Sequence, residues 1–469
     1  MSIRVKSVSF EDYQNTQVTA KCANFLQSAE MSKLQEGQDN IEKVEALVFE
    51  REGLRVGQTI VVYKKSLRIF KKALLLHGPL LNYHSLDSLT ELLEALILYL
   101  RKKNIATLSI HPYLTNLIRN EKLENIEVDK ASDVLKVFET LGFEHSLDSE
   151  QSLVVNQMFV KPIENFASSD EILAAFSPSL KRDLKKFTAL NVKIEELDEH
   201  QLDQFYDILS RTAERKGFSV HPLVYFQNLK KCFGKSAKFM LAYLDCPAYL
   251  VYLDENIQSF EAKIQALKEG PQKKRTKGQI ADAEDQLRSY YKRLEQFKSY
   301  QIKTDKLPLS AYLFMNYGPE IVSFYGGNDE AYLNFGGAVL LHWEMIKYAK
   351  SKAKKRFNFY GTIETEAASS GKGNFNFKRQ FGGQLETLVG SFDKSLNPFY
   401  DIFKKTLVKT SVAIAKKPIQ MKIIISIGFL SYCLQIFLSD FNITSIISAF
   451  TIHNLKGISS LTCDNKGIF

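Results

Sequence analysis

The most regular stretch of the chain covers residues 253–300, LDENIQSFEAKIQALKEGPQKKRTKGQIADAEDQLRSYYKRLEQFKSY. In its first half, four apolar residues follow one another at intervals of three, four and three: Ile257, Phe260, Ile264 and Leu267. In its second half, two apolar rows repeat every seven residues: Ile280, Leu287 and Leu294, and Ala283, Tyr290 and Phe297. This spacing is typical of a coiled-coil seam, and Gly270-Pro271 interrupts the helix between the halves. We therefore predict an antiparallel coiled-coil helical hairpin within residues 253–305.

The tip of this hairpin is strongly basic. Residues 268–277, KEGPQKKRTK, carry one acidic and five basic side chains, among them Lys273, Lys274 and Arg275. A run of like charges on an exposed turn is usually only solvated. The alternative is contact with the phosphate groups of RNA or of a membrane surface. Both interpretations stay open at this point.

Mixed α/β patterns lie on both sides of the hairpin. In residues 1–150, the β-rich runs 60–63 and 106–110 flank an amphipathic helix at 88–103. A second unit has helices and strands before and after the hairpin: helices at 170–187, 199–216 and 340–352, and strands at 192–194, 309–315, 321–325 and 357–360. We predict a mixed α/β (α+β) fold with one domain in residues 1–150 and a second in residues 151–252 and 306–415. The hairpin is then an insertion in the second domain.

The last part of the chain, residues 421–469, differs from the rest. Residues 423–438, IIISIGFLSYCLQIFL, contain no charged side chain, and Lys416, Lys417 and Lys422 precede them. This run is shorter than the roughly 20 residues that a helix needs to cross a bilayer. Three interpretations stay open: a membrane anchor, an interfacial helix, and sequence translated in a non-native frame.

Composition and charge narrow the class of protein. With 45% hydrophobic residues among 469, the chain can bury a large core, which argues against global disorder. The 62 basic and 53 acidic residues give a net charge of +9, compatible with a polyanionic partner or with an ordinary basic protein. The five cysteines are scattered without a CxxC pair, which argues against structural zinc and a disulfide framework. The N-terminus has no apolar run of a signal peptide, so we expect a cytoplasmic protein.

Several well-known catalytic motifs are missing. The sequence contains no GxGxxG, GxxxxGK[ST], HExxH or GxSxG pattern, which argues against dinucleotide, P-loop, zinc-protease and serine-hydrolase chemistry. It also lacks the R/Q-x-x-G-x-G/A loop that binds the pyrophosphate of acetyl-CoA in acetyltransferases. A conventional CoA-dependent enzyme is therefore disfavoured.

Polar and aromatic residues gather instead in five stretches of the second domain: AERKGF (213–218), HPLVYFQN (221–228), SFYGGND (323–329), HWEMIKYA (342–349) and FNFKRQFG (375–382). In the third, Tyr325-Gly326-Gly327 predicts a turn whose backbone approaches a neighbour closely. In the fifth, Phe377-Lys378 places a cation beside an aromatic ring, which suits a phosphate or a developing oxyanion. For any one of these residues alone, packing in the core is the more common role.

Taken together, these stretches resemble the FemABX family, the tRNA-dependent aminoacyltransferases that build the interpeptide bridge of bacterial peptidoglycan. The resemblance runs from residue 24 to about residue 401 in the same order. It implies two domains with the GCN5-acetyltransferase-like fold. The predicted hairpin is similar to the coiled-coil arm of members that act on lipid-linked precursor. The resemblance also implies aminoacyl-tRNA as the co-substrate, with no cofactor and no metal.

The same resemblance implies the partners. The acceptor is the stem-peptide lysine amine of a lipid-linked or nucleotide-linked muropeptide precursor, with lipid II expected. The chain would then work in the cytoplasm at the inner face of the cell membrane, and no DNA partner is expected. Two alternatives stay open: a CoA-dependent N-acetyltransferase, and a non-catalytic relative that binds tRNA or the membrane.

The resemblance also assigns residues. Lys378, with Phe377, matches the family's functional Phe-Lys pair, and we expect its charge to act on the oxyanion or on a tRNA phosphate. The expected substrate-binding residues are Phe377, Tyr325, Tyr225, His221, His111 and Lys33. His221 and His111 depart from the family pattern, because they stand where an Arg and an Asp are usual; a neutral His offers neither a bidentate contact nor a fixed negative charge.

A basic surface completes the expected site. Four basic residues lie on the helix predicted at 170–187: Lys181, Arg182, Lys185 and Lys186. With Lys273, Lys274 and Arg275 of the hairpin tip, they are the candidates for tRNA phosphate contacts.

Overall fold

The computed structural model describes residues 3–15, 23–38, 40–66, 69–147, 154–271, 273–362, 372–403 and 405–406. The chain divides into two compact units, residues 1–397 and 398–469. In the second unit, the described residues 398–403 and 405–406 are helical. The predicted apolar tail, residues 421–469, lies outside the described residues. In the part that the structure describes, every helix is too short or too polar to cross a bilayer.

Among the described residues, the first sheet has eight strands in the order β1-β2-β3-β4-β6-β17-β9, with β5 paired to β3. Their bounds are β1 (Arg4–Val8), β2 (Ile41–Arg51), β3 (Leu54–Ser66), β4 (Phe70–Leu76), β5 (Leu80–Leu81), β6 (Thr107–His111), β9 (Glu144–Ser146) and β17 (Ser391–Ser395). Side chains alternate along β3, so Val61 and Tyr63 face one core while Ile60 and Val62 face another. Four helices accompany this sheet: α1 (Phe10–Gln14), α2 (Ala29–Glu36), α3 (Leu86–Lys102) and α4 (Ser132–Thr140), with the 3₁₀ turn η1 (Phe25–Gln27).

The second sheet has nine strands in the described residues, in the order β11-β12-β13-β14-β15-β10-β16-β7-β8. Their bounds are β7 (Thr115–Asn120), β8 (Asn125–Glu127), β10 (Gln157–Pro162), β11 (Val192–Leu197), β12 (Ala237–Asp245), β13 (Lys306–Tyr317), β14 (Glu320–Asn328), β15 (Arg356–Gly361) and β16 (Gln384–Leu388). The pair β14–β15 is parallel, and its ladder ends at Val322 and Asn358. Beyond this point β14 stays paired with β13 and β15 with β10, so the sheet splits between β14 and β15.

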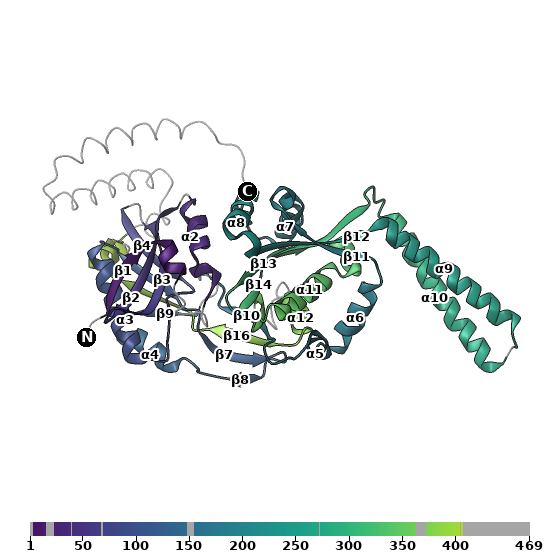
Figure 1. The fold of residues 1–469 in the computed structure, drawn as a ribbon, viewed down its shortest axis with the longest axis horizontal. Helices are drawn as coiled ribbons and strands as arrows, with labels where there is room; N and C mark the ends of the chain where they lie inside the picture. Colours follow the sequence, from purple (N-terminus) through teal and green to yellow (C-terminus); the bar gives the residue numbers. More distant parts are fainter. Residues whose placement is uncertain are drawn as a thin grey trace, which may run out of the picture. The chain divides into compact units, whose positions relative to one another are not determined.

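Helices cover both faces of the second sheet (Figure 1). α7 (Leu202–Lys216) and α8 (Leu223–Phe233) pack on one face, and α11 (Gly337–Ser351) packs on the other. The remaining helical segments of this region are α5 (Ser169–Ala174), α6 (Pro178–Thr188), α12 (Lys372–Arg379), η2 (Glu199–Gln201), η3 (Gly234–Ser236) and η4 (Glu330–Phe335). The mixed α/β class predicted from the sequence is confirmed.

The two sheets exchange strands. β7 and β8 come from the first 150 residues but belong to the second sheet, whereas β17 comes from near residue 393 and pairs with β6 and β9 of the first. The sheets therefore do not follow the predicted boundary at residue 150. Whether the predicted ranges fold as independent domains stays a prediction.

A long helical hairpin is present where the sequence predicts one. α9 (Cys246–Glu269) and α10 (Lys274–Ser299) lie side by side (Figure 1). Of the predicted apolar rows, Ile257, Ile264, Ala283 and Phe297 are buried, and the hydroxyls of Tyr252 and Tyr290 lie 3.3 Å apart across the pair. The hairpin connects β12 to β13, two neighbouring strands of the second sheet, and is thus an insertion in it.

Two local expectations are wrong. The helix expected at 170–187 is two helices, α5 and α6, because Ser177 caps a new helix and Pro178 occupies its first position, where a missing N–H costs nothing. Tyr325-Gly326-Gly327 is not a turn but part of strand β14. The glycines are needed for close packing, since a Cβ on Gly326 would lie 2.0 Å from the Tyr312 ring.

Candidate functional site

Lys378 is buried at the end of the short helix α12, with 6% of its surface exposed. Its Nζ donates to the carbonyl oxygens of Tyr360, at 3.1 Å, and of Gly361, at 2.5 Å. Burial, with a smaller effect of the Lys216 charge, lowers the pKa of Lys378 to about 7. The amine can therefore gain or lose its proton near neutral pH, while two backbone acceptors fix its position.

The backbone at the end of β15 presents these acceptors. Tyr360 has a left-handed conformation with φ of 60°, which is uncommon for a bulky residue. Its N–H donates to Oδ1 of Asn358 at 2.8 Å instead of to a neighbouring strand. The β14–β15 ladder has ended at Asn358, and β15 stays paired with β10 only through a β-bulge, in which the pairing passes from Asn358–Val160 to Gly361–Met158.

Three tyrosines form a group beside this bend: Tyr225 from α8, Tyr325 from β14 and Tyr360 from β15. The Phe226 ring lies 5.3 Å from Tyr225 and 5.4 Å from Tyr325, both edge to face. Burial raises the pKa of Tyr325 to about 12, and it raises the pKa values of Tyr225 and Tyr360 further. All three hydroxyls therefore keep their protons at neutral pH and can donate hydrogen bonds to a substrate.

His221 extends this group. Its ring stacks on Tyr225 with centroids 4.0 Å apart, and burial lowers its pKa. Lys33 is exposed on α2, the helix that packs against α8. The structure thus joins His221 to the tyrosines directly, and it places Lys33 on a neighbouring helix.

Phe377, next to Lys378 in the chain, packs against the core. Its ring lies 5.1 Å from His342, which stacks on Phe359 and has its two ring nitrogens paired with Ser323 and Ala338. Burial lowers the pKa of His342 to about 3, so this histidine is neutral. Phe377 therefore packs against a satisfied core histidine and anchors α12.

His111 lies in the first sheet, at the end of β6. Its Nε2 is 3.2 Å from Ser109 Oγ, and burial lowers its pKa to about 4. It is therefore a neutral, buried side chain. Its described contacts lie in the first sheet and not among the tyrosines around Lys378.

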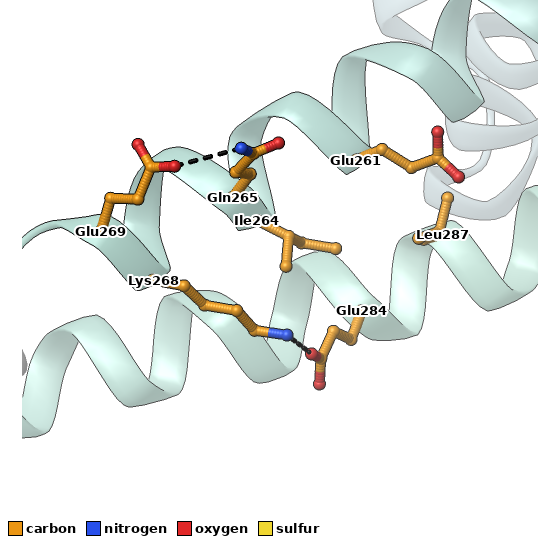
Figure 2. Close-up of a pocket in the computed structure, with 7 residues that line it drawn as sticks. All are labelled: Glu261, Ile264, Gln265, Lys268, Glu269, Glu284 and Leu287. Carbon is orange, nitrogen blue, oxygen red and sulfur yellow. Dashed lines mark hydrogen bonds and ion pairs between the residues drawn. The ribbon is translucent and has the colours of Figure 1, made fainter.

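The expected tRNA-binding residues are exposed on two separate elements. Lys181, Arg182, Lys185 and Lys186 lie on α6, and Lys273, Lys274 and Arg275 lie at the hairpin tip. The cation Lys268 of the tip is different, because it pairs with Glu284 at 2.9 Å (Figure 2). This pair borders a groove of about 520 Å³ lined by Glu261, Ile264, Gln265, Lys268, Glu269, Glu284 and Leu287. None of the expected site residues lines it.

Three residues around Lys378 were not expected: Tyr360, Asn358 and Lys216. The sequence offered weak signals for two of them, since Tyr360 ends a predicted strand just before a glycine and Lys216 lies within AERKGF. Their roles depend on backbone carbonyls and on neighbours far apart in the chain, which sequence spacing does not reveal.

Comparison with known proteins gives consistent matches. A sequence model of the FemAB family matches residues 6–409. Aminoacyltransferase FemA from Staphylococcus epidermidis RP62A is 26% identical over 348 residues, covering 72% of this chain and 83% of that protein. Aminoacyltransferase FemA from Staphylococcus aureus MRSA252 is 26% identical over 346 residues, covering 71% and 82%. The crystal structure of FemX superposes with a TM-score of 0.68 at 20% identity, covering 85% of this chain and 99% of FemX, so the two share a fold.

Proposed function

The chain belongs to the FemAB family and is an aminoacyltransferase, and we propose that it transfers an amino acid from aminoacyl-tRNA to the stem-peptide lysine amine of a muropeptide precursor. Family membership supports a role in the synthesis of the peptidoglycan interpeptide bridge. The tRNA donor and the lipid-linked acceptor are the specific parts of this proposal. A lipid-linked acceptor would bring the enzyme to the inner surface of the membrane.

The reaction needs little from the protein. An aminoacyl ester is already activated, so the amine of the acceptor attacks its carbonyl carbon and the tRNA hydroxyl leaves. The protein must orient the two substrates and stabilise the negative charge on the tetrahedral oxygen. The proton of the attacking amine leaves through the substrate or water.

The observation that carries the proposal is the position of Lys378. Its amine is held by two carbonyls beside three protonated tyrosines, and its pKa of about 7 lets it be cationic in neutral solution. A cation fixed in a buried site stabilises an oxyanion or a tRNA phosphate more strongly than one in water. Tyr225 and Tyr325 are suited to orienting the acceptor peptide by hydrogen bonds.

Transfer of labelled Ala, Ser or Gly from charged tRNA onto lipid-linked and nucleotide-linked precursor tests the reaction. Chains ending at Gln420 and at Phe469 would also show whether the tail matters. We expect label on a precursor with the wild type and at least a 100-fold loss with Lys378→Met, a magnitude typical of removing one oxyanion-stabilising group.

Lys394→Met is the matched control. Lys394 lies on β17 of the first sheet, and its amine also donates to two successive carbonyls, those of Leu141 and Gly142. Its transfer rate should stay near that of the wild type. Binding of CoA with acetyl transfer would favour the acetyltransferase alternative. Binding of tRNA without any transfer would favour a non-catalytic relative.

A further inference from the structure

The conformation of Tyr360 requires a cause. A left-handed backbone is unfavourable for a bulky L-residue, and such residues persist only where their surroundings hold them. Two features hold it here: the β-bulge against β10 between Asn358 and Gly361, and the hydrogen bond from the Tyr360 N–H to Asn358 Oδ1, at 2.8 Å. The conformation matters because it directs the Tyr360 carbonyl at the Lys378 amine.

Asn358 is itself fixed. It is fully buried, and its Nδ2 donates to the Tyr113 hydroxyl at 3.1 Å and to Glu320 Oε2 at 3.3 Å. These acceptors set the orientation of the amide, because a flipped amide would turn its oxygen toward a carboxylate and its NH₂ toward the Tyr360 N–H. Oδ1 must therefore face Tyr360.

An ion cluster holds the acceptors in turn. Arg356 donates from Nε to Glu320 at 2.9 Å, and its two terminal nitrogens donate to Glu386 at 3.0 Å and to the Tyr113 hydroxyl at 2.8 Å. Tyr113 donates to Glu320 at 2.8 Å. Glu320 and Glu386 are almost fully buried. Buried pairs with complete hydrogen bonding are rigid, because breaking one leaves an uncompensated charge.

We propose that Asn358 is a positioning residue for Lys378. The cluster of Tyr113, Glu320 and Arg356 holds Asn358, and Asn358 in turn fixes the left-handed bend at Tyr360. The carbonyls of Tyr360 and Gly361 then locate the Lys378 amine. Asn358 does not touch the substrate and acts only through Tyr360. The proposal builds on the proposed role of Lys378 for its effect on rate. Its structural part stands independently, because the position of the amine can be measured without transfer.

Two variants of nearly equal size separate positioning from mere stability. Asn358→Ala removes the acceptor for the Tyr360 N–H, whereas Asn358→Ser keeps a hydroxyl oxygen two residues before that N–H, as in ordinary Ser turns. Both variants lose the bonds to Tyr113 and Glu320, so their losses of packing and stability are similar. The difference between them reports on the contact to Tyr360.

The measurement is competitive acetylation of the full chain with acetic anhydride over a range of pH, followed by mass spectrometry of the Lys378 peptide. Acetic anhydride reacts with neutral amines, so the midpoint gives the Lys378 pKa. In Asn358→Ala we expect the bend to open to water and the midpoint to rise by about one unit or more toward the ordinary lysine value. In Asn358→Ser the midpoint should stay near that of the wild type. Gln58→Leu, which alters a buried amide of the first sheet, should leave it unchanged.

The kinetic result should follow the same order. We expect kcat to fall about tenfold in Asn358→Ala with KM for charged tRNA changed less than about twofold, which is the signature of a group acting on the reacting centre.

Equal midpoints in folded Ala and Ser variants would overturn the proposal. If the Ala variant does not fold, hydrogen exchange at the Tyr360 amide of the wild type decides: slow exchange supports the bond to Asn358, and exchange as fast as in an open loop contradicts it. Absent transfer in the wild type would overturn the proposed function but not the positioning of the amine.

Discussion

At the scale of the residue, the proposed chemistry depends on the charge of one amine. The pKa of Lys378 is about 7, so its cationic fraction falls as the pH rises through neutrality. An arginine at this position would stay charged, because its pKa lies above 12. The pH dependence of Lys378→Arg therefore differs from that of the wild type only through the proton on Lys378.

This difference gives a prediction with a definite sign. The quantity to plot against pH is kcat/KM of the wild type divided by kcat/KM of Lys378→Arg. This ratio should be flat below about pH 7 and fall about tenfold per pH unit above it. The break lies at the pKa of Lys378, because kcat/KM reports pKa values of the free enzyme. Taking the ratio cancels the titration of the acceptor amine. The corresponding ratio for Lys394→Arg should not change with pH. A ratio for Lys378→Arg that rises with pH would instead identify the neutral amine as a base.

At the scale of the element, α6 and the hairpin tip each present a group of exposed cations. Each phosphate contact adds close to one unit to the slope of log K against log salt. We expect replacement of the four α6 cations by Gln to weaken tRNA binding and to reduce this slope by about two to four units. Replacement of Lys273, Lys274 and Arg275 by Gln tests the hairpin tip in the same way, because a reduced slope would show that the tip also contacts tRNA phosphates. Lys136→Gln on α4, an exposed cation paired with Asp133, is the control and should leave the slope unchanged. An unchanged slope in the α6 variant would assign these cations to solvent.

Elements with a strong local signal could be predicted from the sequence. The hairpin follows from its apolar rows and from Gly270-Pro271, and α11 and β15 lie within a few residues of their expected positions. The helix expected at 170–187 is instead two helices, because Ser177-Pro178 is a capping signal that begins a second one. The site was predicted only in part: Lys378, Tyr325 and Tyr225 came from a family resemblance. Asn358 and Tyr360 could not be predicted, because their roles arise from a backbone bend and a buried cluster that joins distant strands.

At the scale of the whole molecule, the exchange of strands links the two sheets. β17 lies between β6 and β9, so a chain cut at residue 150 loses the central partner of both strands. We expect the fragment 1–150 to lack cooperative thermal unfolding. A longer chain, residues 1–397, should unfold cooperatively, because it contains every described strand of both sheets. A sharp transition in the short fragment, with dispersed amide resonances, would instead show that the first predicted domain is autonomous.

The late position of β17 also has a consequence during synthesis. A ribosome that has just released β6 and β9 must still translate most of the second sheet and the whole hairpin before residues 391–395 emerge. At about 5–20 residues per second, this interval is on the order of tens of seconds. Throughout it, β6 presents an unpaired edge to other nascent chains and β9 lacks the strand with which it pairs, and exposed edges are a known route to aggregation. Safe production of this enzyme therefore depends on how the cell shields an unfinished sheet until its last strand arrives.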